Sequence, residues 1–149
     1  MVRFAWPGWW LGLFLGSGFP GVAQKQDPKP SVELKENYPN PFYPSTTIPF
    51  EIRPEICSAG YKPLVRLEVR NSIAQLVAIP TVSAYGAQRL DLVRLACGEY
   101  RAFWDGKYLD GQQEVTTGVY YYRLTVDGRP YTRKMIVQRR PAPAATSSK

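Results

Sequence analysis

The sequence predicts an all-β protein built as an antiparallel β-sandwich of about seven strands. Three observations lead to this fold class. From residue 46 onward, short segments alternate between apolar and polar residues, which is typical of strands with one buried face. Turn-forming residues separate these segments, and no stretch keeps the period of an amphipathic helix. The chain has 149 residues, which suits one domain of ordinary size.

The expected strands follow from this alternation. In the first of them, Ile48, Phe50 and Ile52 share one face. The last two are joined by Asp127-Gly128, a pair that favours a two-residue hairpin because both positions tolerate a positive φ. In chain order, the expected strands cover residues 46–52, 64–71, 76–79, 90–95, 99–104, 119–126 and 129–138.

Prolines determine the conformation of residues 37–45. Pro39, Pro41 and Pro44 fix their own φ and push the residues before them toward extended backbone, so this segment cannot form a helix. We expect it to lie against a sheet edge, with Tyr38 and Phe42 as its apolar contacts.

The first 23 residues have the layout of a signal peptide. Arg3 is followed by an uncharged apolar run, which ends in small residues at 21–23. The alternative is an uncleaved membrane anchor, because residues 4–23 carry no charge. We expect a polar leader over 24–36, the domain over 37–138 and a disordered tail over 139–149. The predicted location is secreted, periplasmic or on the outer cell surface of a bacterial envelope.

Cys57 and Cys97 are the two cysteines of the chain. In an exported domain the simplest arrangement is one disulfide between them. A reactive thiol pair is the alternative, but there is no CxxC spacing and no histidine to lower a thiol pKa.

Composition argues against catalysis. The chain contains no histidine, which excludes Ser-His-Asp triads and most zinc sites. Asp105, Asp110 and Glu114 are a calcium-site alternative, although their Gly-rich surroundings favour solvated turns, and Glu99 lacks an identifiable catalytic partner. We expect no enzymatic activity, cofactor, metal or small-molecule substrate. The formal charge of +7 comes from basic residues spread along the chain, which favours a solvated basic surface over a nucleic-acid groove.

Three segments together resemble a known superfamily of β-domains. Residues 36–48 are similar to the opening of C-terminal sorting domains of type IX secretion. Residues 69–77 and the second half are similar to the flagellar hook-capping (FlgD-type) immunoglobulin-like domain. The residues that carry the resemblance, all expected to be structural, are Asn37, Tyr38, Pro39, Asn40, Pro41, Phe42, Trp104, Asp105, Gly106, Gly111, Gly118, Tyr120, Tyr122, Leu124, Arg133, Lys134 and Met135.

This resemblance implies an immunoglobulin-like sandwich. Trp104 is expected to fill one end of it, Asp105-Gly106 to form a tight turn, and Gly118 to permit a close approach or an unusual φ. The leading function is a secreted or cell-envelope module that acts in binding or structural assembly. The alternatives are a sorting domain recognised by an outer-membrane export machine and a hook-assembly-like scaffold. The expected partner is a protein at the cell surface or in the secretion machinery, with the oligomeric state open.

One possible contact surface follows from the outward-pointing residues of two expected strands. Arg101 and Phe103 belong to one strand, and Tyr121 and Arg123 to another. A sheet face bearing these four side chains, or an unpaired edge strand, is the candidate for binding.

Overall fold

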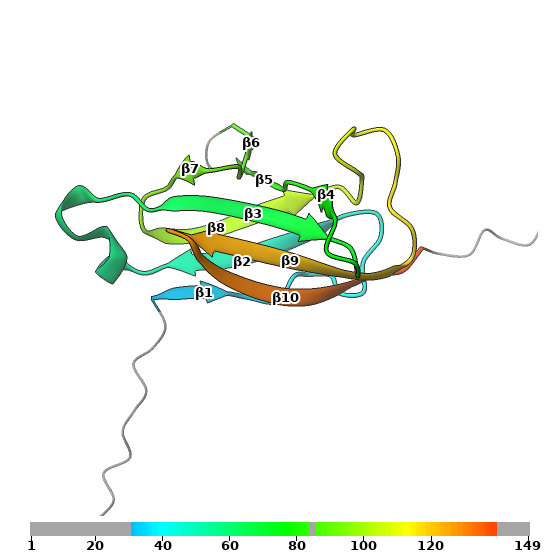
Figure 1. Cartoon of the computed structure of the whole chain (residues 1–149), viewed down its shortest axis with the longest axis horizontal. Helices are drawn as coiled ribbons and strands as arrows, with labels where there is room; N and C mark the ends of the chain where they lie inside the picture. Colours follow the sequence, from blue (N-terminus) through cyan, green and yellow to red (C-terminus); the bar gives the residue numbers. More distant parts are fainter. Residues whose placement is uncertain (1–30, 84–85, 140–149) are drawn as a thin grey trace, which may run out of the picture.

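The computed structural model describes residues 31–83 and 86–139, which form a β-sandwich of two antiparallel sheets (Figure 1). Sheet A has the order β1-β2-β8-β5-β6, and sheet B has the order β10-β9-β3-β4, with β7 pairing with β3. The elements are β1 (Val32–Leu34), β2 (Thr46–Ile52), the 3-10 segment η1 (Pro54–Gly60), β3 (Leu64–Arg70), β4 (Leu76–Ala78), β5 (Thr81–Val82), β6 (Gln88–Arg89), β7 (Val93–Arg94), β8 (Gly98–Trp104), β9 (Gly118–Val126) and β10 (Arg129–Val137).

The core lies between the sheets and is filled by the alternating residues of the longer strands. β2, β8 and β9 bury every second side chain, as the sequence predicts. Asp127 and Gly128 both have positive φ in the β9–β10 turn, which confirms the expected hairpin. The largest fully buried side chains are Tyr122, Phe42, Phe50, Ile48, Ile52, Leu67, Leu90, Leu95, Leu124, Met135, Val65 and Val69.

The strand expected over residues 90–95 is confirmed only at Val93–Arg94 (β7), and the prediction is wrong for Leu90 to Leu92. Leu90 and Leu95 are buried, but Leu92 is 58% exposed and has a φ of 56°, a left-handed conformation that interrupts a strand. The chain instead crosses between the layers here. β6 pairs with β5 in sheet A, and β7 pairs with β3 in sheet B.

The prediction of a polar leader over residues 24–36 is wrong at its C-terminal end. β1 pairs with β2 in sheet A, and Val32 and Leu34 are buried in the core. Three residues are too short for an alternating pattern to stand out in the sequence. The expected signal peptide (1–23), the rest of the leader before Ser31 and the tail beyond Arg139 lie outside the described residues.

The proline-rich segment covers an edge of the sandwich, as expected. Phe42 is buried, and its backbone N–H donates to the carbonyl of Ile136 on the edge strand β10. Asn40 Oδ1 accepts a hydrogen bond from the Ile136 backbone N–H at 3.0 Å. Tyr38 corrects the expectation, because its side chain is 51% exposed rather than an apolar contact against the sheet.

Asn37 and Arg133 connect this region to both sheets. The backbone N–H of Asn37 donates to Tyr122 Oη at 3.2 Å, and the Tyr122 hydroxyl donates to the Lys35 carbonyl at 2.9 Å. Arg133 Nε, on β10, donates to the Leu34 carbonyl of β1 at 2.6 Å. The facing edges of the two sheets are therefore linked by side chains of the family-like motif.

A disulfide joins Cys57 and Cys97, with the two Cα atoms 5.9 Å apart. Cys57 lies in η1, which carries the chain from sheet A to sheet B, and Cys97 directly precedes β8. The bridge therefore ties the crossover segment to a central strand, which confirms the predicted pairing.

The loop after β8 is a pair of tight turns around a buried tryptophan. Trp104 is buried between Phe42 and Tyr120, and its Nε1 donates to the Lys107 carbonyl at 2.9 Å. Gly106 has a φ of 71°, as a turn requires. Gly118 differs from the prediction: its φ is not positive, and an added Cβ would meet Tyr120 only at an ordinary 4.0 Å.

Candidate functional site

The four predicted contact residues do not form one face. Arg101 and Phe103 lie on β8 in sheet A, whereas Tyr121 and Arg123 lie on β9 in sheet B. All four alternate with core residues of their own strands, so each pair points away from the interior. The predicted face is therefore split between the two opposite outer faces of the sandwich, meaning the sides of the sheets that point away from the core.

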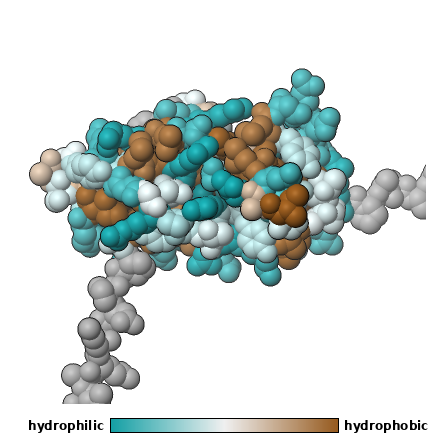
Figure 2. Space-filling view, viewed as in Figure 1, coloured by the Kyte–Doolittle hydropathy of each residue, from teal (hydrophilic) through white to brown (hydrophobic). Residues whose placement is uncertain are grey.

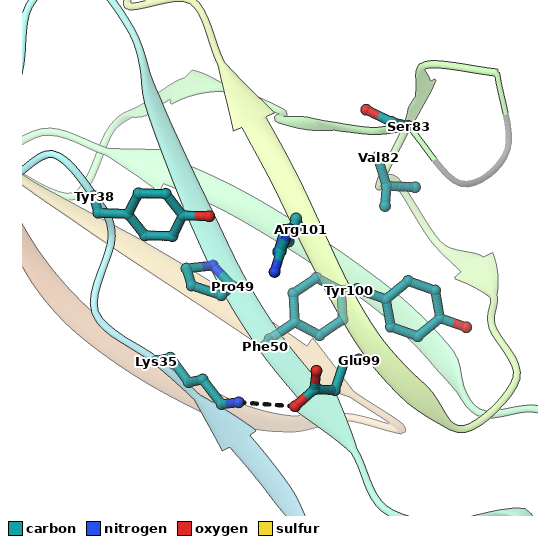
Figure 3. Close-up of a pocket in the computed structure, with 9 residues that line it drawn as sticks. All are labelled: Lys35, Tyr38, Pro49, Phe50, Val82, Ser83, Glu99, Tyr100 and Arg101. Carbon is teal, nitrogen blue, oxygen red and sulfur yellow. Dashed lines mark hydrogen bonds and ion pairs between the residues drawn. The ribbon is translucent and has the colours of Figure 1, made fainter.

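The outer face of sheet A is hollowed between β2 and β8. The hollow has a volume of about 590 Å³ and is called here the sheet A trough. Tyr38 and Pro49 lie to one side of Arg101, and Val82 and Ser83 to the other (Figure 3). Its lining residues are Lys35, Tyr38, Pro49, Phe50, Val82, Ser83, Glu99, Tyr100 and Arg101.

One end of the trough carries an ion pair. Lys35 Nζ lies 3.2 Å from Glu99 Oε1 (Figure 3). This hydrogen bond raises the pKa of the Lys35 ammonium, with smaller contributions from the charges of Glu99, Glu33 and Glu51. Glu33, Glu51 and Glu99 are direct cross-strand neighbours on β1, β2 and β8, so three carboxylates line up beside one lysine.

The middle of the trough presents an arginine without a carboxylate partner. Arg101 lies opposite Pro49 in the β2–β8 register, and among the described residues it makes no ion pair or side-chain hydrogen bond. In the next row, Phe103 is 44% exposed opposite Thr47, and Thr47 in turn bridges to Tyr38. Two exposed aromatic rings thus flank a threonine beside an unpaired guanidinium.

Two core side chains, Phe50 and Tyr100, form the floor of the trough. The Phe50 and Tyr100 rings stack at a centroid distance of 5.2 Å, and both side chains are buried. The Tyr100 hydroxyl donates to the Ala96 carbonyl at 2.7 Å, next to the disulfide-bonded Cys97. The strands that carry the exposed groups are therefore anchored by core packing beneath them.

The calcium alternative has little geometric support. Asp105 Oδ1 accepts the backbone N–H of Lys107, and Asp110 Oδ1 accepts that of Gln112, so both carboxylates close solvated turns. Glu114 instead accepts hydrogen bonds from the Tyr43 hydroxyl and from Arg139. Across residues 31–83 and 86–139, no group of three acidic or cysteine ligands is placed to hold a metal ion.

Sequence reasoning found Arg101 and Phe103 but not the other groups around the trough. Lys35 is 64 positions from Glu99, and Tyr38 is placed beside the trough by its bridge to Thr47. Only the pairing of β1, β2 and β8 brings these residues together. The alternation of Thr47, Pro49 and Glu51 with buried residues in β2 was the one available sign of an outward row.

No family model matches the sequence, and neither the curated proteins nor the solved structures include a match. In the described part of the chain, no helix is long and apolar enough to cross a membrane.

Proposed function

We propose that the chain is a non-enzymatic, exported β-sandwich module that binds a protein partner through the sheet A trough and the neighbouring Phe103. The observation that carries the proposal is the unpaired Arg101 in the row next to two exposed aromatic side chains, Tyr38 and Phe103. Tyrosine, phenylalanine and arginine are the residue types enriched at the centres of protein interfaces. A partner carboxylate that pairs with Arg101 would gain a charge-assisted hydrogen bond.

Export is part of the proposal. The disulfide between Cys57 and Cys97 is compatible with an oxidising compartment outside the cytoplasm. The signal-peptide layout of residues 1–23 supports the same location. Binding is preferred over catalysis because the chain has no histidine and because Glu99 at the trough is ion-paired with Lys35.

Photo-crosslinking tests the binding surface. We expect a photoreactive phenylalanine analogue at position 103 to give one adduct of defined mass in the intact envelope. Arg101→Ala and Tyr38→Ala should weaken that adduct, whereas Arg129→Ala, which removes an exposed arginine from sheet B, should leave it unchanged. An adduct of equal yield from position 119 on β9, or no adduct from position 103, would contradict the proposed surface.

A sorting domain is the second candidate function, and one observation favours it. The sorting-like segment 36–48 contacts the hook-capping-like second half of the chain at two points. Arg133 Nη1 lies 3.6 Å from Glu36 Oε1, and the Asn37 backbone N–H donates to the Tyr122 hydroxyl. Residues that carry a resemblance in separate stretches thus form one connected unit. Intact-mass measurement of the exported protein distinguishes the two candidates: processing near residue 36 or 138 supports sorting, and an otherwise full-length surface-bound chain supports binding.

A further inference from the structure

The outer face of sheet B carries a concentration of basic side chains. In the register of β3, β9 and β10, one cross-strand row contains Arg70, Tyr121 and Lys134. The next row contains Glu68, Arg123 and Thr132, and Arg66 lies in the row beyond. Figure 2 views the sandwich from the side of sheet B and shows hydrophilic side chains interspersed with apolar patches. We call Arg66, Arg70, Tyr121, Arg123 and Lys134 the sheet B basic face.

A buried carboxylate organises part of this face. Glu68 is only 5% exposed, although its strand position points outward. Its Oε1 lies 3.3 Å from Arg66 Nε, and its Oε2 lies 3.0 Å from Arg70 Nη2. Arg66 Nε is also 3.0 Å from Asp91 Oδ1. Both Glu68 oxygens are therefore engaged, and two arginines are held on the sheet surface.

Arg123 is not paired with a carboxylate in this way among the described residues. Its nearest carboxylate in the register is Glu68, whose oxygens are already taken by the two neighbouring arginines. Arg123 Nε is buried with no hydrogen-bond acceptor, and Arg123 has no ion pair within residues 31–83 and 86–139. Lys134 also lacks an ion pair within these ranges. The face therefore keeps two uncompensated cations, which an anionic ligand would satisfy.

Tyr121 adds a flat surface between cations. Its side chain is 38% exposed, with Arg70 opposite on β3 and Lys134 opposite on β10. Directly opposed residues on adjacent strands are close enough for their side chains to bind one ligand. An aromatic ring can contact the C–H face of a sugar, while flanking basic groups pair with carboxylate or sulfate substituents.

We propose that the sheet B basic face binds a linear anionic polysaccharide. A sugar ring stacks on Tyr121, and its acidic groups pair with Arg123 and Lys134. Single-stranded nucleic acid has related chemistry, but the disulfide favours a compartment in which acidic glycans are the more accessible polyanions. This inference shares with the proposed function only the location outside the cytoplasm, because the trough lies on the opposite sheet.

Titration calorimetry with the full-length, oxidised protein tests the inference. The probes are heparin as a sulfated glycan, polygalacturonate as a carboxylated glycan, dextran as a neutral glycan and an oligodeoxythymidine. We expect both acidic glycans to bind more weakly as salt rises, and dextran not to bind. Arg123→Ala should weaken binding roughly tenfold, the effect of one lost charge-assisted hydrogen bond.

Matched variants distinguish binding at specific residues from attraction by the overall charge of the protein. Arg129→Ala removes the same charge from β10 outside the basic face, so it should leave affinity within about twofold of the unchanged protein. Tyr121→Ala should lose affinity while Tyr121→Phe retains it, since stacking needs the ring and not the hydroxyl. All variants must keep the far-ultraviolet circular dichroism of the parent.

Four results would overturn the inference. The first two are that neither acidic glycan binds at low salt, and that Arg129→Ala and Arg123→Ala lose the same affinity for them. The other two are that dextran binds as tightly as the acidic glycans, and that the oligodeoxythymidine binds more tightly than they do with the same dependence on Arg123. A failure of the trough crosslink would leave this inference unaffected, because the two tests report on different sheets.

Discussion

Gly106 offers a sharp test of the packing between the family-like segments. Its φ of 71° lies in the left-handed region, and an added Cβ would collide with the backbone carbonyl oxygen of Pro44. That carbonyl belongs to the proline-rich segment, which also holds Phe42 against Trp104. Gly106→Ala therefore strains its own turn and pushes the segment away from the core.

The magnitude of this effect has two parts. Placing alanine in the left-handed region costs about 1–2 kcal/mol. Moving a packed backbone carbonyl adds about 1–3 kcal/mol, the range for overpacking in a core. The free energy of unfolding should therefore fall by about 2–5 kcal/mol in Gly106→Ala, as the sum of these two ranges.

Gly111 supplies the matched control. Its φ of 69° is nearly the same, but an added Cβ would meet nothing within 4 Å. Gly111→Ala should therefore lose only the conformational part, about 1–2 kcal/mol. Urea unfolding followed by circular dichroism measures both variants. Equal losses in the two variants would show that Pro44 does not pack against Gly106.

Three further predictions concern stability. Reducing the Cys57–Cys97 disulfide should lower the free energy of unfolding by roughly 3–4 kcal/mol in the loop-entropy model, and an unchanged urea midpoint under reductant would contradict this. Trp104→Ala should cost roughly 3–5 kcal/mol because the ring is buried, and calorimetric melting showing no change would mean the ring is exposed. Burial raises the pKa of the Tyr122 phenol, so its neutral form is favoured in the fold. The free energy of unfolding should therefore fall as pH rises above about 10, where the phenol of the unfolded chain ionises. Tyr122→Phe should remove part of that alkaline loss. Identical pH profiles of the free energy of unfolding for the variant and the unchanged protein would refute the assignment.

The sequence was sufficient to predict strands with one buried face. Every second residue of β9 from Tyr120 to Val126 is buried, as the alternation indicates. The disulfide could be predicted because two cysteines in a chain with a signal-peptide layout allow only one intramolecular pair. These features depend on local periodicity or on counting, and neither requires knowledge of the strand order.

Strand order accounts for what the sequence could not supply. β8 and β9 both point aromatic and basic residues outward, but nothing in their local pattern says that they belong to different sheets. The predicted single contact face therefore became two. The burial of Glu68 was missed for a related reason: its outward position is covered by Arg66 and Arg70, which a period of two cannot reveal.

The most distinctive sequence motifs turn out to hold the sandwich closed. Asn40 and Phe42 occupy backbone groups of the edge strand β10, and Arg133 binds the backbone of β1. An edge protected in this way is less available for pairing with another chain. A resemblance carried by such residues therefore identifies structural constraints better than it identifies a ligand. Recognition is better sought in the outward rows, where Arg101 and Arg123 lack carboxylate partners among the described residues and thus add little to the stability of the fold itself.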